Sequence, residues 1–261
     1  MRSATNRAVS RNPVVPGWMK PLPVVLTLAL WETVTRLNLL PPYLLPSPEA
    51  VAQRLFQTAQ SGLLFQHLAA TLQEVLLGLA LGLAAATGLG TLLAKSPVAE
   101  KLLSPYIVAS QSIPTVAIAP LLVIWFGPGR LSKILISSLL VFFPVLVNTV
   151  VGIRSVPEDL HDLMRILKAS PWQIFTRLEL PAALPVYLGG VRVGATLSVI
   201  GAVVGEFVGA DEGLGFLINV ARGMYDTALV FAAVFVLIAL ALGLYGLVSL
   251  IERRVLSWQL N

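Results

Sequence analysis

The chain has 261 residues, of which 56% are hydrophobic and only 12% are charged, and its mean hydropathy is +0.83. An average soluble domain has about 25% charged residues, so this composition excludes a soluble globular protein and indicates an integral membrane protein. The absence of cysteine excludes disulfides and thiolate metal sites. The formal net charge of +5 is interpreted as lysine and arginine gathered in cytoplasmic loops, not as a nucleic-acid-binding surface.

The apolar residues gather in runs that are long enough to cross a membrane, which takes about 20 residues of helix for a hydrocarbon core of about 30 Å. The runs are continuous and do not alternate with period two, which favours helices over a β-barrel. The sequence therefore predicts an all-α polytopic membrane protein with six transmembrane helices, at residues 19–37, 66–94, 105–127, 131–153, 182–209 and 226–250.

The N-terminal segment "MRSATNRAVSRNPVVPGWMK" has basic residues and no acidic one, which places it in the cytoplasm. Six crossings return the C-terminus to the same side. We therefore expect a basic cytoplasmic tail at 1–18, a single transmembrane domain at 19–254 and a cytoplasmic tail at 255–261. Most lysine and arginine residues fit this orientation, while Arg130 and Lys133 are expected in an outer loop and Arg192 within a span.

Two connections are long enough to hold helices of their own. After the first span, Ser47 and Pro48 are typical of a helix start and predict a short amphipathic helix along the outer interface. The connection at 154–181 holds "SVPEDLHDLMRILKASPWQIFTRLEL" and lies on the cytoplasmic side. There, Ser155 with Glu158 is expected to cap one helix, and Ser170-Pro171 to begin a second one that ends at Leu180-Pro181.

This two-helix segment allows two interpretations. It is either an interfacial helix pair that packs beneath the bundle, or a docking element that inserts into a groove of a cytoplasmic partner. Its basic residues are balanced by acidic ones, which suits a protein groove better than an anionic lipid surface.

The segment resembles the coupling-loop signature of binding-protein-dependent ABC transporter permeases, in which Glu-Ala-Ala is followed at fixed spacing by Gly and then by Leu-Pro. Asp162-Leu163-Met164 stand at the Glu-Ala-Ala positions, Lys168 at the Gly position and Leu180-Pro181 at the Leu-Pro positions. Lysine in place of glycine predicts that the two helices meet at a different angle. The resemblance implies contact with an ATPase by Asp162, Leu163, Met164, Lys168, Ala169, Ser170, Trp172, Phe175, Leu180 and Pro181.

Three further stretches, "PSPEAV", "IPTVAIAPLLVIWFG" and "IGAVVGEFVGADEGLG", resemble the subfamily that imports nitrate, sulfonates, taurine and vitamin precursors. The similarity extends over residues 45–255 and is greatest to permeases for the thiamine pyrimidine precursor and for riboflavin. It implies a type I importer permease in a prokaryotic cell membrane, acting as a homodimer with cytoplasmic ABC ATPase subunits and an extracytoplasmic solute-binding protein.

The sequence predicts no chemistry of its own for this chain. It lacks Gly-x-x-x-x-Gly-Lys-Ser/Thr and His-Glu-x-x-His, so no catalytic residue, cofactor or metal site is expected, and ATP with magnesium would be hydrolysed by the partner ATPase.

Polar residues inside spans are costly and are functional candidates by default. They are expected either to line the solute path or to form hydrogen bonds between helices, with a structural or gating role favoured for Glu206 near the "GADEGLG" turn. His67 is expected as a surface histidine. The candidate path residues are Ser110, Gln111, Ser112, Pro114, Thr115, Asn148, Arg192 and Glu206.

An alternative function is an ion-coupled secondary transporter that uses Glu74, Glu206 and Arg192, although such proteins usually show repeated halves, which this sequence lacks. The solute stays open. A pyrimidine or flavin calls for aromatic and amide contacts, whereas nitrate or a sulfonate calls for a positive charge such as Arg192.

Overall fold

The structure is a computed structural model that describes residues 21–259. This part of the chain consists of helices joined by short connections. The predicted tail at 1–18 and the first residues of the first predicted span lie outside this range. The helices are α1 (Leu22–Arg36), α2 (Pro48–Gln60), α3 (Leu63–Lys95), α4 (Pro97–Gln111), α5 (Thr115–Phe126), α6 (Arg130–Arg154), α7 (Glu158–Ile166), α8 (Pro171–Ile174), a π-helical turn (Phe175–Glu179), α9 (Leu180–Val208), α10 (Leu214–Gly223), α11 (Thr227–Val255) and a 3₁₀ turn (Ser257–Gln259).

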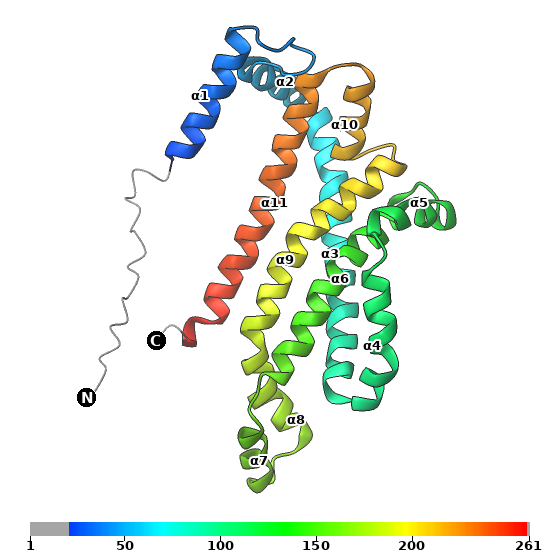
Figure 1. Cartoon of the computed structure of the whole chain (residues 1–261), viewed down its shortest axis with the longest axis vertical. Coiled ribbons are helices and arrows are strands. Elements are labelled where there is room, and N and C mark those ends of the chain that lie inside the picture. Colours follow the sequence, from blue (N-terminus) through cyan, green and yellow to red (C-terminus); the bar gives the residue numbers. More distant parts are fainter. Residues whose placement is uncertain (1–20, 260–261) are drawn as a thin grey trace, which may run out of the picture.

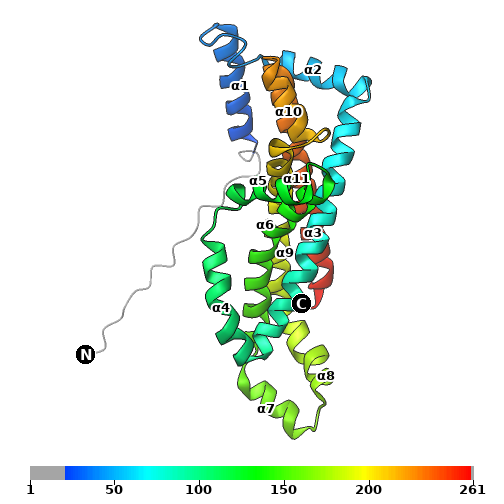
Figure 2. The same ribbon diagram turned by 90° about the vertical axis from the view of Figure 1, so that its right-hand side faces the viewer.

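Three long helices, α3, α6 and α9, pack side by side at the centre (Figure 1). Helix α11 covers α9, and α2 and α10 lie at the end of the bundle drawn at the top. Helices α7 and α8 project from the opposite end, below α6 and α9, as both views show (Figures 1 and 2). These two ends are called the upper and the lower end.

Glycine allows the central helices to approach closely, as the small residues of "LGLALGLAAATGLG" predict. A Cβ atom at Gly82 would lie 2.7 Å from Val141 Cβ on α6, and one at Gly90 would lie 2.7 Å from Thr149 Cβ. On the other side of α6, a Cβ at Gly201 of α9 would lie 2.5 Å from the Cα of Ser137. Glycine is therefore required where α6 is held between α3 and α9.

Four helices of the described chain are long and apolar enough to cross a membrane, or five spans when α4 and α5 count as one bent span. These four are α3, α6, α11 and the continuous helix that runs from Pro171 to Val208. Helix α1 has 15 described residues and no buried one, and it packs on α11 through Trp31, whose ring lies 5.8 Å from that of Phe231. The count of six spans therefore stays a prediction.

The third predicted span, 105–127, is not one straight helix. It is divided into α4 and α5, which meet at an angle of 96°. The break falls at Ser112–Pro114, where Pro114 precedes the first residue of α5. Proline has no N–H to continue the helical ladder and disfavours the helical conformation of the residue before it, which accounts for the bend.

The prediction that a helix ends at Leu180-Pro181 is wrong, because the helix runs without interruption from Pro171 to Val208. The π-helical turn of Phe175–Glu179 precedes Pro181, and the N–H of Leu180 donates to the carbonyl of Phe175, five residues back. This wider turn carries the chain through a proline that a regular i→i−4 ladder would not accommodate.

The connection between the fifth and sixth predicted spans, for which the sequence analysis predicts no helix, contains helix α10. Its buried residues Leu214, Leu217, Ile218 and Ala221 recur at helical spacing. The last three of them pack on α11 through Leu229 and Ala233. The amphipathic helix expected at Ser47-Pro48 is confirmed, since the Ser47 hydroxyl accepts a hydrogen bond from the N–H of Ala50 at 3.2 Å.

The glycine contact between α9 and α6 gives a testable prediction. Gly201→Ala places a methyl group against the backbone of Ser137, so we expect the free energy of unfolding to fall by about 1–3 kcal/mol. The matched control is Gly243→Ala on α11, where a Cβ meets nothing within 4 Å and alanine favours the helix. Thermal unfolding of the two variants in detergent measures the difference. Equal midpoints would contradict close packing at Gly201.

Candidate functional site

The segment 154–181 forms a helix–turn–helix at the lower end of the bundle. The turn between α7 and α8 is tight, with the N–H of Lys168 donating to the carbonyl of Arg165 at 2.9 Å and that of Ala169 to Met164 at 2.9 Å. Lys168 has φ = 53°, the left-handed conformation that glycine adopts at least cost. Lysine thus occupies this position without abolishing a tight turn, and the different angle expected between the two helices stays a prediction.

The two helix starts of this segment differ from each other in how well the sequence predicts them. Ser170 forms a complete capping box, with its hydroxyl accepting from the N–H of Gln173 and the Gln173 side chain accepting from the N–H of Ser170. The predicted cap at Ser155 is wrong, because α7 begins after Pro157 and the Ser155 hydroxyl donates to the carbonyl of Gly152 at 2.7 Å. Proline restricts its own φ angle and has no N–H to donate, so the helix begins after Pro157 and not at Ser155.

Large apolar side chains of the segment point away from the bundle. Ile166 is 78% exposed and Trp172 is 71% exposed, and the ring of Trp172 lies 5.9 Å from that of Phe175. Further exposed apolar residues are Leu160, Leu163, Leu167 and Leu180. Asp162 pairs with Arg165 on the surface of α7 at 2.9 Å. The segment therefore carries an apolar surface that the remainder of residues 21–259 does not cover.

The segment extends beyond any membrane that the bundle crosses. The continuous helix from Pro171 has 38 residues, so it is about 57 Å long at 1.5 Å per residue, against about 30 Å for the hydrocarbon core. With Glu206 and α10 at its upper end, its first turns and the whole of α7 must lie outside the apolar layer.

Glu179, one of the acidic residues that balance the charge of the segment, lies at its base. It is buried, and its carboxylate pairs with Lys95 at the end of α3 at 2.7 Å and with His161 of α7 at 3.5 Å. The Lys95 ammonium also lies 4.4 Å from the centre of the Phe175 ring. The sequence around Glu179 does not predict these contacts, because both partners, Lys95 and His161, are distant from it in sequence.

The predicted path residues of the third span gather at the bend between α4 and α5. Ser110 and Ser112 donate to backbone carbonyls of α4, at 2.8 Å to Ile107 and at 3.3 Å to Val108. Gln111, Ser112 and Pro114 are exposed in the single chain, whereas Ser110 and Thr115 are partly buried. The bend thus brings five predicted residues to one open part of the surface, and their role in solute passage stays a prediction.

Asn148 lies on α6 and Arg192 on α9, and each has partners of its own. Asn148 donates to the carbonyl of Pro144 at 2.8 Å and packs against Gly190, where a Cβ would lie 2.7 Å from its own. Arg192 forms an ion pair with Glu252 of α11 and a hydrogen bond with the Tyr245 hydroxyl. The partner that a membrane-embedded arginine requires is therefore Glu252.

Glu206 belongs to a buried polar cluster at the upper end. Its carboxylate accepts from the Thr71 hydroxyl at 2.6 Å and from the N–H of Gly215. Thr71 accepts in turn from the N–H of Leu214 at 2.8 Å, and His67 accepts at Nδ1 from the N–H of Gly213 at 3.0 Å. The turn at 213–215 is thereby fixed to α3, which agrees with the structural role favoured for Glu206. His67 is 5% exposed, so its expected place at the surface is wrong.

Lys133 extends the same cluster and corrects a second expectation. It does not lie in an outer loop but in the first turn of α6, where it is 2% exposed and its ammonium lies 3.6 Å from Glu74, which is fully buried. Arg130, three residues earlier, is exposed and pairs with Glu212 at 2.6 Å. The sequence signal was present in the apolar residues that follow Lys133, which place it within the helix and not before it.

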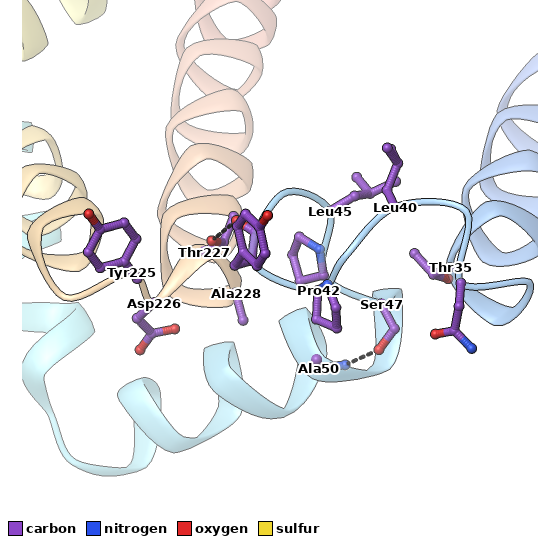
Figure 3. Close-up of a pocket in the computed structure, with 13 residues that line it drawn as sticks. Thr35, Leu40, Pro42, Leu45, Ser47, Ala50, Tyr225, Asp226, Thr227 and Ala228 are labelled. Carbon is purple, nitrogen blue, oxygen red and sulfur yellow. Dashed lines mark hydrogen bonds between the residues drawn. The ribbon is translucent and has the colours of Figure 1, made fainter.

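A hollow of about 470 Å³ lies at the upper end, between the connection at 37–47 and the start of α11 (Figure 3). The Thr227 hydroxyl closes one side by donating to the carbonyl of Tyr43 at 2.7 Å. Asp226 in its wall accepts from Arg54 at 2.7 Å and from the N–H of Leu229 at 3.0 Å. Within residues 21–259, no group of three or more side chains suited to a metal ion occurs.

Comparison with known proteins places this architecture among membrane components of importers. Residues 52–257 match the family described as the binding-protein-dependent transport system inner membrane component. The chain belongs to this family.

Relatives of established name support the assignment. The chain is 47% identical to the riboflavin transport system permease protein RibX of Chloroflexus aurantiacus, over 94% of this chain and 91% of that one. It is 37% identical to the formylaminopyrimidine transport permease protein ThiX of Halalkalibacterium halodurans, over 90% and 93%. It is 34% identical to the putative aliphatic sulfonates transport permease protein SsuC of Bacillus subtilis, over 93% and 88%.

A solved structure shares the fold. A chain of the MetNI methionine ABC transporter in an inward-facing conformation superimposes with a TM-score of 0.66 at 20% sequence identity, over 76% of this chain and 98% of that one. The predicted all-helical permease fold is confirmed at this level.

The ion pair in the upper cluster gives a second prediction. Lys133→Met leaves the carboxylate of Glu74 buried, with no hydrogen bond to either oxygen within the described chain, so we expect a loss of about 3–5 kcal/mol of unfolding free energy. Replacing both residues, as Lys133→Met with Glu74→Leu, removes the uncompensated charge and recovers most of the loss. Denaturant titration of the purified protein measures both. A double variant no more stable than the single one would show that the pair is not a unit.

Proposed function

We propose that this chain is the membrane-spanning permease subunit of an ATP-driven importer and that the segment 154–181 receives the motion of a separate ATPase subunit. The observation that carries the proposal is the apolar surface of α7 and α8, where Ile166 and Trp172 are the most exposed large side chains. A rigid two-helix element with uncovered apolar residues outside the apolar layer suits a hydrophobic groove on a partner protein.

The orientation of the chain follows from its charges. Arginine and lysine residues gather at the lower end, on the last turns of α3, α6 and α11 and on the projecting segment. The positive-inside rule then makes the lower end cytoplasmic, and it brings the segment to the side where ATP is available. Both the start of α1 and the end of α11 point toward this side (Figure 1).

The family and the relatives' names support the partners expected for such a subunit: a solute-binding protein that delivers at the upper end, ABC ATPase subunits at the lower end, and a second permease chain, for which an identical copy is proposed. The chain itself contributes no P-loop, so ATP and magnesium belong to the ATPase.

The ion-coupled alternative is not favoured. Its three ionisable residues are each held by a partner: Glu74 by Lys133, Glu206 by Thr71, and Arg192 by Glu252. Glu74 and Glu206 lie in one cluster at the upper end, whereas Arg192 lies 14 residues before Glu206 on α9, about 21 Å away along the helix. The three residues therefore form no common ion-coupling site, and the family of the chain is that of binding-protein-dependent transport.

For the solute, we favour a ring compound such as riboflavin or a thiamine pyrimidine precursor over nitrate, a sulfonate or taurine. Arg192 is the cation within a span that made an anionic solute a possibility, and its charge is neutralised by Glu252. The relatives named for riboflavin and formylaminopyrimidine are also more similar to the chain, at 47% and 37% identity, than the aliphatic sulfonate relative of Bacillus subtilis at 34%.

Docking on the ATPase gives a third prediction. Trp172→Ala removes an exposed ring and leaves the fold intact, but we expect it to weaken ATPase binding by about 2 kcal/mol or more, as for an aromatic interface hot spot. The control is Trp258→Ala, which removes another exposed ring outside the segment. Co-purification and ATPase activity in nanodiscs measure the effect. Equal behaviour of the two variants would leave the segment as a packing element only.

Solute choice gives a fourth prediction. Proteoliposomes that contain the permease, its ATPase and its solute-binding protein are expected to accumulate riboflavin or formylaminopyrimidine with ATP, and not taurine or nitrate. Matched vesicles without ATP are the control. Uptake of taurine or nitrate alone would contradict the ring-compound proposal while leaving the importer proposal intact.

A further inference from the structure

The underside of the bundle does not pack solidly against the segment 154–181. A cavity of about 780 Å³ separates them, lined by the last residues of α3 and α6, the start of α4, helix α7 and the π-helical turn. Forces on α7 therefore reach the bundle through a few side chains that bridge this space, and not through a continuous apolar contact.

Three charged side chains around the cavity, Arg154, Asp162 and Arg165, form ion pairs that do not connect α7 with the bundle. Arg154, at the end of α6, binds Glu100 of α4 at 2.6 Å and the carbonyl of Leu93 at 2.9 Å. Arg165 pairs with Asp162 within α7 itself. These pairs hold the bundle or the helix together, and they do not connect α7 with α3.

Glu179 is the exception within the described chain. One carboxylate oxygen lies 2.7 Å from the ammonium of Lys95 on α3, and the other lies 3.5 Å from Nε2 of His161 on α7. The Glu179 side chain is 11% exposed, against 39% for Lys95 and 25% for His161, so the bridge is partly shielded from water and salt. Phe175, one turn earlier, packs beneath the Lys95 ammonium.

We propose that Glu179 is a positioning residue for energy coupling, which joins α7 through His161 to the lower end of α3 through Lys95. The inference rests on the proposed function, because it assumes that an ATPase binds the segment. Displacement of α7 then acts on α3 as well as on α9, to which Glu179 is covalently joined. Since α3 packs along α6 with glycine contacts at Gly82 and Gly90, the two ends of the bundle move together.

The test uses the complete transporter, with ATPase and solute-binding protein, in proteoliposomes. Three quantities are measured: co-purification of the ATPase, stimulation of ATP hydrolysis by the loaded binding protein, and solute transported per ATP. For Glu179→Gln we expect the ATPase to stay bound and the transport per ATP to fall by about fivefold or more, which is the lower range of coupling between distant sites. A merely structural residue would change the amount of folded protein and not this ratio.

Lys95→Gln removes the other half of the bridge and should produce the same loss, whereas Lys101→Gln, an exposed lysine on neighbouring α4, should not. The charge exchange Lys95→Glu with Glu179→Lys restores an ion pair and should recover coupling relative to either single exchange. If Glu179→Gln does not fold, Lys95→Gln and the charge exchange carry the same test.

The outcomes are distinguishable. Normal transport per ATP in Glu179→Gln or Lys95→Gln with the ATPase bound overturns the positioning role and leaves the proposed function standing. A charge exchange that folds but does not recover coupling also overturns it. A wild-type chain that binds no ATPase overturns the proposed function, and the inference with it.

Discussion

The close approach of α3, α6 and α9 is the constraint on which the rest of the structure depends. Helices in lipid gain little from hydrophobic association, so they are held by close packing and by a few polar contacts. Glycine at 82, 90 and 201 provides the first of these by removing the side chain at each contact. With α6 fixed between its two neighbours, the polar groups at either end acquire fixed partners.

The two ends of the bundle use these partners differently. At the upper end, Lys133 and Glu74 are almost without exposure, and Thr71 and Glu206 bind the backbone N–H groups of the first two residues of α10. Buried charges of this kind are tolerated only when paired, so this end holds one arrangement. At the lower end, the Glu179 bridge spans a cavity and its partners Lys95 and His161 are partly exposed, so α7 is not held by a fully buried pair.

Much of this arrangement follows from the sequence, and the exceptions have physical causes. Apolar length predicts the spans of α3, α6, α9 and α11, and the capping signals of Ser47 and Ser170 predict two helix starts. A proline within the third span indicates a kink, but neither the size of the bend at Pro114 nor the continuity of the helix at Pro181 was predicted, because proline alone does not determine the outcome. Near Pro114 the chain bends by 96°, whereas before Pro181 a π-helical turn absorbs the missing N–H. Local sequence does not distinguish these results, since both depend on what packs around them.

Ion pairs between residues distant in sequence could not be predicted, because they also depend on which helices pack together. Lys133, Arg192 and Glu179 were visible as isolated charges, but their partners Glu74, Glu252 and Lys95 lie on other helices. These ion pairs join different helices and have different consequences. The Arg192–Glu252 pair joins α9 to α11 and neutralises a cation within the membrane, while the Glu179–Lys95 pair joins the projecting segment to α3. The continuous helix from Pro171 to Val208 contains Trp172 at one end and Glu206 at the other, so a single rigid element connects the exposed lower surface with the buried upper cluster.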